Sequence, residues 1–215
     1  MKPFDQCHLY TFIDTAYLHG RKPSEIARQL CAGGSDLIQL RAKKSSPDEI
    51  HRMAEEIQPI LQKSNVGLVI NDHPDIAKKI GADLCHLGQE DFFDLPHSQR
   101  PTLNSQLGLS THSPDQAARA LAANPAYIAI GPVYATGTKP TAKPVTLEYV
   151  RWAAANVKTP WFAIGGINLT TLEDVLVAGA NRICVVSAIL NAKDVAEECQ
   201  KYSVMLRSVK RASLR

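Results

Sequence analysis

The chain has 215 residues, of which 45% are hydrophobic, and its formal net charge is +3 at pH 7. This length and composition support one sizeable buried core and exclude a largely disordered chain. Four positive charges fall in the last nine residues, at Arg207, Lys210, Arg211 and Arg215. The rest of the chain is therefore near neutral, which excludes a broad basic surface for nucleic acid.

The five cysteines are scattered through the chain, and no two of them form a C-x-x-C pair. This pattern favours reduced core thiols in a cytoplasmic protein over disulfides or metal ligands. The first residues lack the apolar segment of a signal peptide, and no apolar run approaches the length of a membrane span. We therefore expect a soluble cytoplasmic protein that binds neither nucleic acid nor a membrane.

Short apolar runs alternate with helical patterns and predict, in chain order, strand 6–13, helix 25–32, strand 36–41, helix 47–62, strand 66–70, helix 75–80, strands 83–87 and 106–109, helix 114–122, strand 127–130, helix 147–155, strand 161–164, helix 171–178, strand 182–186 and helix 194–205. Segment 92–101 contains two prolines and predicts a loop or a short helical turn. The strand runs are continuously apolar, which is typical of a parallel sheet buried on both faces.

Repeated helix ends and starts favour one regular architecture. Ser46 and Ser113 each precede proline and a capping-box acceptor, and both predict a helix start. Glycine recurs between a helix and the next strand at Gly34, Gly81 and Gly179. Units of roughly 25 residues fill the chain, which favours an α/β fold, a single closed (β/α)8 TIM barrel, over an open doubly wound sheet. We expect the barrel over residues 1–206 and a basic tail, a frayed helix end, over residues 207–215.

Polar residues follow the predicted strands, where a barrel of this type builds its active site. Gln39, Arg41 and Lys43 alternate along one strand end and therefore point to the same side. A charged strand end is often only a solvated edge, but the apolar neighbours here favour an anion site. Asp72 and Asp91 follow two adjacent strands; either could cap a helix or lie in a turn, and together they could hold one Mg²⁺.

Hydroxyls and glycines follow the later strands. Ser110 is not needed as a helix cap, because Ser113 serves that purpose. A long proline-containing loop holds Thr136-Gly137-Thr138-Lys139, which offers two hydroxyls and a cation to an anionic group. Gly165-Gly166 and Val186-Ser187 follow the last two strands, where many barrels bind phosphate.

Three histidines have different expected roles. His112 lies at the rim beside the candidate groups and could transfer a proton, although a histidine at a helix start is usually solvated. His86 lies within a strand, and we expect a hydrogen-bonded core residue there. His73 is expected to open a helix.

Taken together, the motifs resemble the thiamine phosphate synthase family. The resembling segments run in order from about Leu9 to Leu190 and read Gln-x-Arg-x-Lys, Asn-Asp, His-Leu-Gly-Gln-Glu-Asp, Gly-Leu-Ser-Thr-His, Gly-Pro-Val-Tyr-x-Thr-x-Thr-Lys, Ile-Gly-Gly-Ile and Val-Ser-Ala-Ile. The resemblance implies Mg²⁺-dependent coupling of 4-amino-2-methyl-5-(diphosphooxymethyl)pyrimidine with a thiazole phosphate, with release of pyrophosphate.

The resemblance also implies roles for individual residues. Those with catalytic roles are Arg41, Lys43, Ser110 and Lys139. The pyrimidine diphosphate would be held by Gln39, Arg41, Lys43, Asn71, Ser110 and Lys139, with Leu40 and Ala42 on the same segment. Mg²⁺ would be bound by Asp72 and Asp91. The thiazole phosphate would be held by Thr136, Gly137, Thr138, Gly166, Val186 and Ser187. The chain departs from the family pattern at Ala42, where glutamate is frequent, and at Gly137, where proline is common.

Other functions remain open at this point. A related thiazole tautomerase keeps the phosphate site and a histidine comparable to His112, but it typically lacks the metal aspartates and the Thr-x-Thr-Lys loop. A non-catalytic protein that binds thiazole or thiamine phosphate would need neither diphosphate nor metal groups. A sugar-phosphate isomerase would need a paired acid and base at the rim, which the sequence does not suggest. We therefore expect the synthase, with small-molecule substrates as partners, and leave open whether it forms a homo-oligomer.

Overall fold

The computed structural model describes residues 1–96, 100, 106–138 and 141–213, with side chains described as far as residue 208. Its parallel strands pair in chain order, and β8 pairs with β1, so that the sheet closes into a barrel. The strands are β1 (Leu9–Asp14), β2 (Leu37–Arg41), β3 (Gly67–Asn71), β4 (Leu84–Gly88), β5 (Leu107–Thr111), β6 (Tyr127–Ile130), β7 (Trp161–Ile164) and β8 (Ile183–Cys184). The (β/α)8 barrel predicted from the sequence is confirmed.

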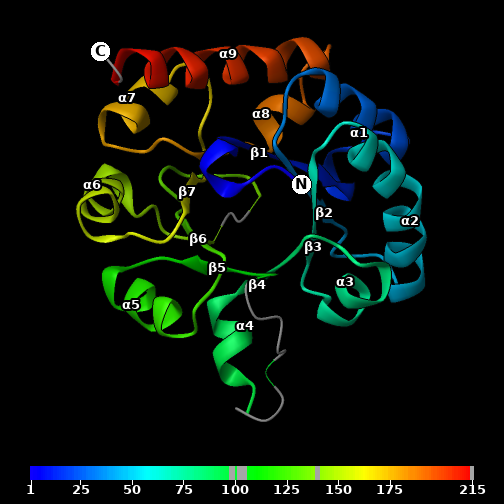
Figure 1. Ribbon diagram of the computed structural model, residues 1–215, viewed down its shortest axis with the longest axis horizontal. Helices are drawn as coiled ribbons and strands as arrows, with labels where there is room; N and C mark the ends of the chain where they lie inside the picture. The colour runs from blue at the N-terminus through cyan, green and yellow to red at the C-terminus, as the bar shows by residue number, and fades with distance from the viewer. Residues whose placement is uncertain (97–99, 101–105, 139–140, 214–215) are drawn as a thin grey trace.

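Helices surround the barrel in chain order, as Figure 1 shows. They are α1 (Pro23–Ala32), α2 (Pro47–Lys63), α3 (Pro74–Ile80), α4 (Gln89–Asp94), α5 (Pro114–Ala122), α6 (Thr146–Asn156), α7 (Leu172–Val177), α8 (Ser187–Leu190) and α9 (Val195–Ser213). Among the described residues, no helix has both the length and the apolar character needed to cross a membrane.

Several boundaries differ from the sequence expectation. Strand β1 begins at Leu9, because Phe4–Gln6 form a 3-10 turn ahead of it. Helix α4 begins directly after β4 and ends within the segment expected to be a loop or a short turn. The four-residue helix α8 was not expected at all. Helix α9 continues to Ser213, so its last turns include much of the basic tail, while the division of domains at residue 206 stays a prediction.

Alternation along the strands produces two separate cores. Inside the barrel, large side chains pack together from several strands, among them Tyr10, Tyr127 and Phe162. Between the barrel and the helices lies a larger aliphatic core, which includes Ile38 and Leu40 of β2. Successive side chains of a strand point to opposite faces, so β2 sends Leu37, Gln39 and Arg41 inward. This alternation places polar β2 side chains at the inner mouth of the barrel.

A glycine makes room for the large inner side chains. A Cβ on Gly108 of β5 would lie 2.2 Å from Cζ of Tyr127, so only glycine lets the tyrosine ring lie against that strand. All five cysteines are free thiols, and four of them are buried.

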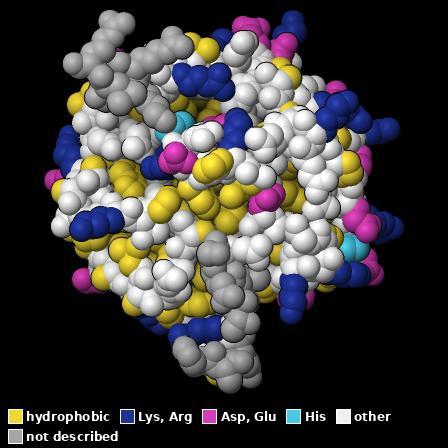
Figure 2. Space-filling model, in the orientation of Figure 1, with side chains coloured by type: hydrophobic (Ala, Val, Ile, Leu, Met, Phe, Trp, Pro, Cys, Tyr) yellow, Lys and Arg dark blue, Asp and Glu magenta, His cyan; other side chains and the backbone are white. Residues whose placement is uncertain are grey.

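In the face drawn in Figure 2, hydrophobic side chains gather across the middle and most charged side chains lie toward the outline.

The predicted helix caps are mostly confirmed. Ser46 and Glu49 form the complete capping box at the start of α2. Ser113 accepts a hydrogen bond from the backbone N–H of Gln116, but the Gln116 side chain accepts from the backbone N–H of His112 instead of Ser113. His73 is the N-cap residue of α3, as expected. The glycines that end helices, Gly34, Gly81 and Gly179, have φ between +63° and +102°, a region that favours glycine.

Candidate active site

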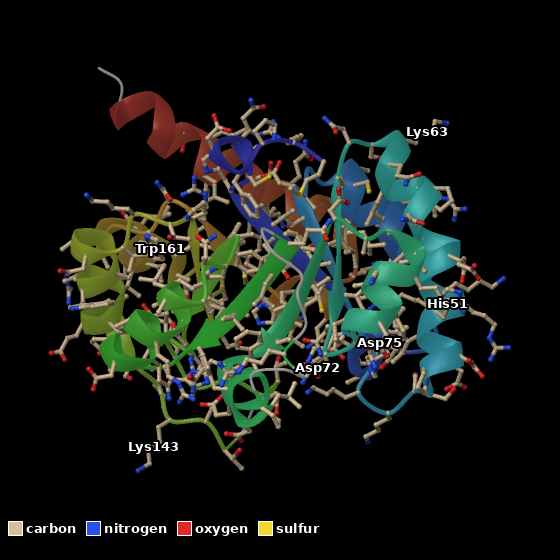
Figure 3. The ribbon with its side chains drawn as sticks, turned by 60° about the horizontal axis from the view of Figure 1, so that its bottom comes forward. His51, Lys63, Asp72, Asp75, Lys143 and Trp161 are labelled. Atoms are coloured by element: carbon tan, nitrogen blue, oxygen red, sulfur yellow. The ribbon has the colours of Figure 1, made fainter. Side chains whose placement is uncertain are left out.

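A cavity of about 760 Å³ opens at the C-terminal ends of the strands. In Figure 3, Asp72 after β3 lies near one end of the barrel, whereas Trp161, the first residue of β7, lies toward the opposite end. Each of the eight strands, or the loop that follows it, contributes residues to the cavity wall. The cavity therefore lies where an active site forms in this fold.

Most of the predicted site residues line this one cavity: Gln39, Arg41, Lys43, Asn71, Asp72, Asp91, Ser110, Thr136, Gly137, Thr138, Gly166, Val186 and Ser187. Two do not, because Leu40 and Ala42 point outward and are buried in the core between the barrel and the helices. Their side chains are therefore not part of the cavity wall. Lys139 lies outside the described residues.

The cationic end of β2 is fixed by a carboxylate on the neighbouring strand. Nη1 of Arg41 donates to Oδ2 of Asp14 over 2.6 Å, and the backbone N–H of Ala16 donates to Oδ1 of the same carboxylate. Asp14 is buried, so its charge is balanced chiefly by Arg41. This ion pair fixes the position of the guanidinium group at the inner mouth of the barrel.

The carboxylates of Asp72 and Asp91 line the cavity. Asp72 has φ +62° and forms an ion pair with Nζ of Lys43, whose side chain is half exposed. Asp91 follows β4, and a Cβ on Gly88 would lie 2.6 Å from its Oδ2, so glycine leaves room for this carboxylate to turn back toward the strand end. Among the described residues, no cluster of three or more His, Cys, Asp or Glu side chains could enclose a metal. Two aspartates with open positions suit Mg²⁺, which commonly takes its other ligands from phosphate and water.

Glycines shape the opposite side of the cavity. Gly165 and Gly166 have φ values of +102° and +66°, and a Cβ on Gly166 would lie 2.6 Å from Cβ of Tyr134 and 2.7 Å from the carbonyl oxygen of Ala135. The close approach requires glycine at this position and leaves its backbone beside the cavity. Ser187 begins α8 after β8, so the backbone of the two last strand ends meets here. This geometry is compatible with the phosphate site that the sequence predicts.

The floor of the cavity is a hydrogen-bonded set of side chains that sequence reasoning only partly recognised. Tyr10 donates to Oε1 of Gln39 over 2.6 Å, and Nε2 of Gln39 donates to Oδ1 of Asn71 over 3.1 Å. On the other side, the hydroxyl of Tyr10 lies 2.9 Å from that of Tyr127. Strand alternation could have placed Tyr10 inside the barrel, but nothing in a single strand indicates which hydroxyls will meet.

Two histidines, His86 and His112, line the cavity. His86 is buried and hydrogen-bonded, as expected, with Nδ1 2.9 Å from the hydroxyl of Tyr127 and Nε2 2.8 Å from Oγ of Ser110. It also lines the cavity, a position that the sequence analysis gave only to His112. Nδ1 of His112 is hydrogen-bonded to the carbonyl oxygen of Gly131. Because a carbonyl oxygen only accepts, His112 carries a proton on Nδ1.

Other cavity residues had no signal in the sequence. Asn168, Asn191 and Glu198 come from segments interpreted as ordinary loop or helix. Asp14, which holds Arg41, ends β1 without a recognisable motif. Asn191 and Glu198 reach the cavity because α8 and the start of α9 lie beside the end of β8. A four-residue helix is too short to produce a periodic pattern, which is why this wall was missed.

The family model of thiamine monophosphate synthase matches residues 9–189. The chain belongs to this family. It is 45% identical over 164 residues to a thiamine-phosphate synthase of Thermus thermophilus, and the match covers 76% of this chain and 79% of that protein. It is 34% identical over 216 residues to the enzyme of the same name from Caldicellulosiruptor bescii, covering 99% of this chain and 97% of that protein.

A solved structure agrees with these sequence relatives. Thiamine phosphate pyrophosphorylase from Pyrococcus furiosus superposes with a TM-score of 0.84 at 26% identity, and the match covers 96% of this chain and 98% of that one. The family, the fold and the transferase class expected from the sequence are therefore confirmed.

Proposed function

We propose that the protein couples 4-amino-2-methyl-5-(diphosphooxymethyl)pyrimidine with a thiazole phosphate to give thiamine phosphate and pyrophosphate. The observation that supports this most directly is the shared cavity, which has a cationic side at Arg41 and Lys43 and a glycine-rich side at Gly165 and Gly166. A diphosphate and a separate phosphate can then lie at opposite sides of one space. Membership of the family supports the same reaction.

The reaction needs charge stabilisation more than a nucleophilic residue. Pyrophosphate leaves from a pyrimidine methylene group that can carry positive charge, and the thiazole nitrogen then attacks that carbon. The protein must stabilise the growing negative charge of the leaving group and align the two rings. Arg41, held by Asp14, is fixed in advance for the first task. Lys43, Ser110, Asn71 and Gln39 complete the proposed diphosphate site, and Lys139 is proposed to join them.

The carboxylates of Asp72 and Asp91 fit a magnesium ion, because both face the cavity and offer oxygen ligands on adjacent strand ends. When bound, Mg²⁺ would offset charge on the diphosphate and orient it. Lys43, paired with Asp72 in this structure, would then be available to the phosphate oxygens. We propose that Thr136, Gly137, Thr138, Gly166, Val186 and Ser187 hold the thiazole phosphate.

The expected location of the enzyme remains the cytoplasm.

A coupling assay tests the proposed function. Purified protein is incubated with both substrates and Mg²⁺, and pyrophosphate and thiamine phosphate are measured. Lys139→Ala should lower the coupling rate by roughly 10²–10³, as expected when a preorganised electrostatic contact is lost. His112→Ala should cost much less, since ionisation of the diphosphate requires no proton transfer.

The same assay separates the synthase from a tautomerase. A wild-type protein that released no pyrophosphate, yet isomerised a thiazole carboxylate phosphate in a manner dependent on His112, would show that the synthase assignment is wrong. A protein that bound thiazole phosphate without converting either substrate would support the non-catalytic alternative.

A further inference from the structure

A continuous line of side-chain hydrogen bonds crosses the floor of the cavity, from Ser110 on β5 to Asn71 on β3. In order, it consists of Ser110, His86, Tyr127, Tyr10, Gln39 and Asn71, with successive contacts of 2.8, 2.9, 2.9, 2.6 and 3.1 Å. We call this set the floor chain. Tyr10 and Tyr127 are at most 1% exposed, and Gln39 is 2% exposed, so water has little access to its middle.

The direction of each hydrogen bond follows from the supply of protons. Burial raises the pKa of Tyr10 and of Tyr127 well above the usual range, so each hydroxyl keeps its single proton. Tyr10 donates that proton to Gln39, and the bond between the tyrosines must therefore take its proton from Tyr127. Tyr127 then accepts from His86, which must carry a proton on Nδ1.

The same reasoning fixes the role of Ser110. A neutral imidazole with its proton on Nδ1 has only a lone pair on Nε2. The hydroxyl of Ser110 must therefore donate to Nε2 of His86. In this order, Ser110 presents only lone pairs to the cavity. Phosphate oxygens also accept hydrogen bonds, so Ser110 cannot bind a diphosphate while its proton is used by His86.

The floor chain can also form with the donor and acceptor of every hydrogen bond exchanged. If the amide groups of Gln39 and Asn71 turn over, Nε2 of Gln39 donates to Tyr10, Tyr10 donates to Tyr127, and Tyr127 donates to Nδ1 of His86. The imidazole then loses its proton from Nδ1 and gains one on Nε2 by exchange with water, so the net charge is unchanged. His86 now donates to Ser110, and the hydroxyl proton of Ser110 is available to a ligand.

We propose that the diphosphate of the pyrimidine substrate selects this second order, and that Tyr10, Tyr127 and His86 are positioning residues that convert Ser110 into a hydrogen-bond donor. This inference rests on the proposed function only in placing a diphosphate at Ser110. The floor chain also couples the two ends, because the turn of the Gln39 amide at β2 and the donor direction at Ser110 on β5 change together. Binding at either end therefore favours the matching arrangement at the other.

Nitrogen NMR of protein labelled with ¹⁵N in its histidine rings measures the proposed change directly, since the two neutral tautomers give different signals. The probe is inorganic pyrophosphate with Mg²⁺, and the signals of His86 are identified by their loss in His86→Gln. We expect the Nδ1–H tautomer in the free protein and the Nε2–H tautomer with pyrophosphate bound. His112 serves as an internal reference, because its contact with Gly131 keeps the proton on Nδ1 in both states.

A pair of matched variants tests the same idea by kinetics. Tyr127→Phe interrupts the floor chain, so His86 is no longer held in the Nδ1–H form by Tyr127. We expect the KM for the pyrimidine diphosphate to fall several-fold, because binding no longer has to reverse the chain, while the KM for the thiazole phosphate stays unchanged. The control is Tyr149→Phe, because Tyr149 is also buried and its hydroxyl lies within hydrogen-bond distance of Oγ1 of Thr111 and the carbonyl oxygen of Ser113 without belonging to the floor chain. It should lose stability without a selective change in either KM.

The outcomes separate this proposal from the proposed function. If pyrophosphate binds, the protein couples its substrates and His86 keeps the same tautomer, the proposed proton order is wrong while the synthase function stands. An unchanged or higher KM for the pyrimidine diphosphate in Tyr127→Phe, or the same selective fall in Tyr149→Phe, also overturns the proposal. If wild-type protein neither binds pyrophosphate nor releases it from the substrate, both the floor-chain proposal and the synthase function fail.

Discussion

The buried carboxylate of Asp14 holds the guanidinium group of Arg41. The aspartate side chain is 1% exposed and the arginine side chain is 15% exposed, so both charges are largely removed from water. The ion pair of Lys43 and Asp72 has the same chemistry but is much more exposed, at 50% and 26%. A buried pair is costly to break because the remaining charge is left without a partner, whereas an exposed pair contributes little.

We therefore predict that Asp14→Ala lowers the free energy of unfolding by about 3 kcal/mol. The variant also removes the acceptor for the backbone N–H of Ala16, which adds to the loss. Lys43→Met is the control, and its cost should stay below about 1 kcal/mol because solvent screens the exposed pair. Urea denaturation measures both values. Equal losses in the two variants would show that burial does not determine the strength of the Asp14 pair.

A second prediction at the residue scale concerns Gly166→Ala. The new Cβ would contact Tyr134 and the carbonyl oxygen of Ala135 at distances that require the loop to move. We expect a higher KM for the thiazole phosphate and an unchanged KM for the pyrimidine diphosphate. Gly81→Ala is matched for backbone strain, since Gly81 has φ +63° but no atom within 4 Å of an added Cβ. It should cost about 1–2 kcal/mol of stability and leave both KM values unchanged. A selective loss of pyrimidine binding in Gly166→Ala would reverse the assignment of the two phosphate sites.

At the scale of elements, α4 is a short helix that depends on its neighbour. It has six residues and no side-chain N-cap hydrogen bond, and it carries Asp91 in its first turn. Cζ of Arg119 on α5 lies 4.0 Å from the centre of the Phe93 ring on α4. This cation–π contact connects the proposed metal ligand to a longer, well-capped helix.

Arg119→Met should therefore lower the free energy of unfolding by about 1 kcal/mol and raise the Mg²⁺ concentration needed for half-maximal coupling. The second effect follows because α4 would hold Asp91 less firmly. Titration of Mg²⁺ in the pyrophosphate-release assay measures it. Arg151→Met, at an exposed position on α6, is the control for loss of a surface arginine. An unchanged Mg²⁺ requirement in Arg119→Met would separate the helix contact from metal binding.

The sequence predicted those elements that have strong local signals. Serine and proline marked the starts of α2 and α5, and glycine marked the ends of α1, α3 and α7, to within about one residue, because caps and left-handed turns depend on neighbouring residues alone. It could not predict α8 or the extent of β8, since two to four residues are too few to show a period. The ends of such short elements are set by what packs against them.

At the scale of the whole molecule, closure of the barrel brings distant residues together. Strand order and alternation placed Gln39, Arg41, Asn71 and Ser110 at one rim, so this part of the site could be predicted once the barrel was recognised. Tyr10 and Tyr127 are separated by 117 residues, and their contact depends on the shear of the closed sheet and on the space at Gly108. Such contacts are a property of the barrel and have no signature in a single strand.

A ligand that contacts several strand ends at once should stabilise the whole barrel. We predict that pyrophosphate with Mg²⁺, at about 100 times its dissociation constant, adds about 2.7 kcal/mol to the stability of the folded state. For a domain of this size, that corresponds to a rise in Tm of about 5–10 °C. Differential scanning calorimetry measures the shift.

The two ligands should depend on each other in this experiment. Pyrophosphate with excess chelator should raise Tm by much less, because Asp72 and Asp91 would then face the diphosphate without a cation between them. In a double variant with asparagine at both positions, removing the metal should have little further effect, because the repulsive carboxylates are gone. The same Tm shift with and without Mg²⁺ in the wild-type protein would show that these aspartates do not bind the metal together with the diphosphate.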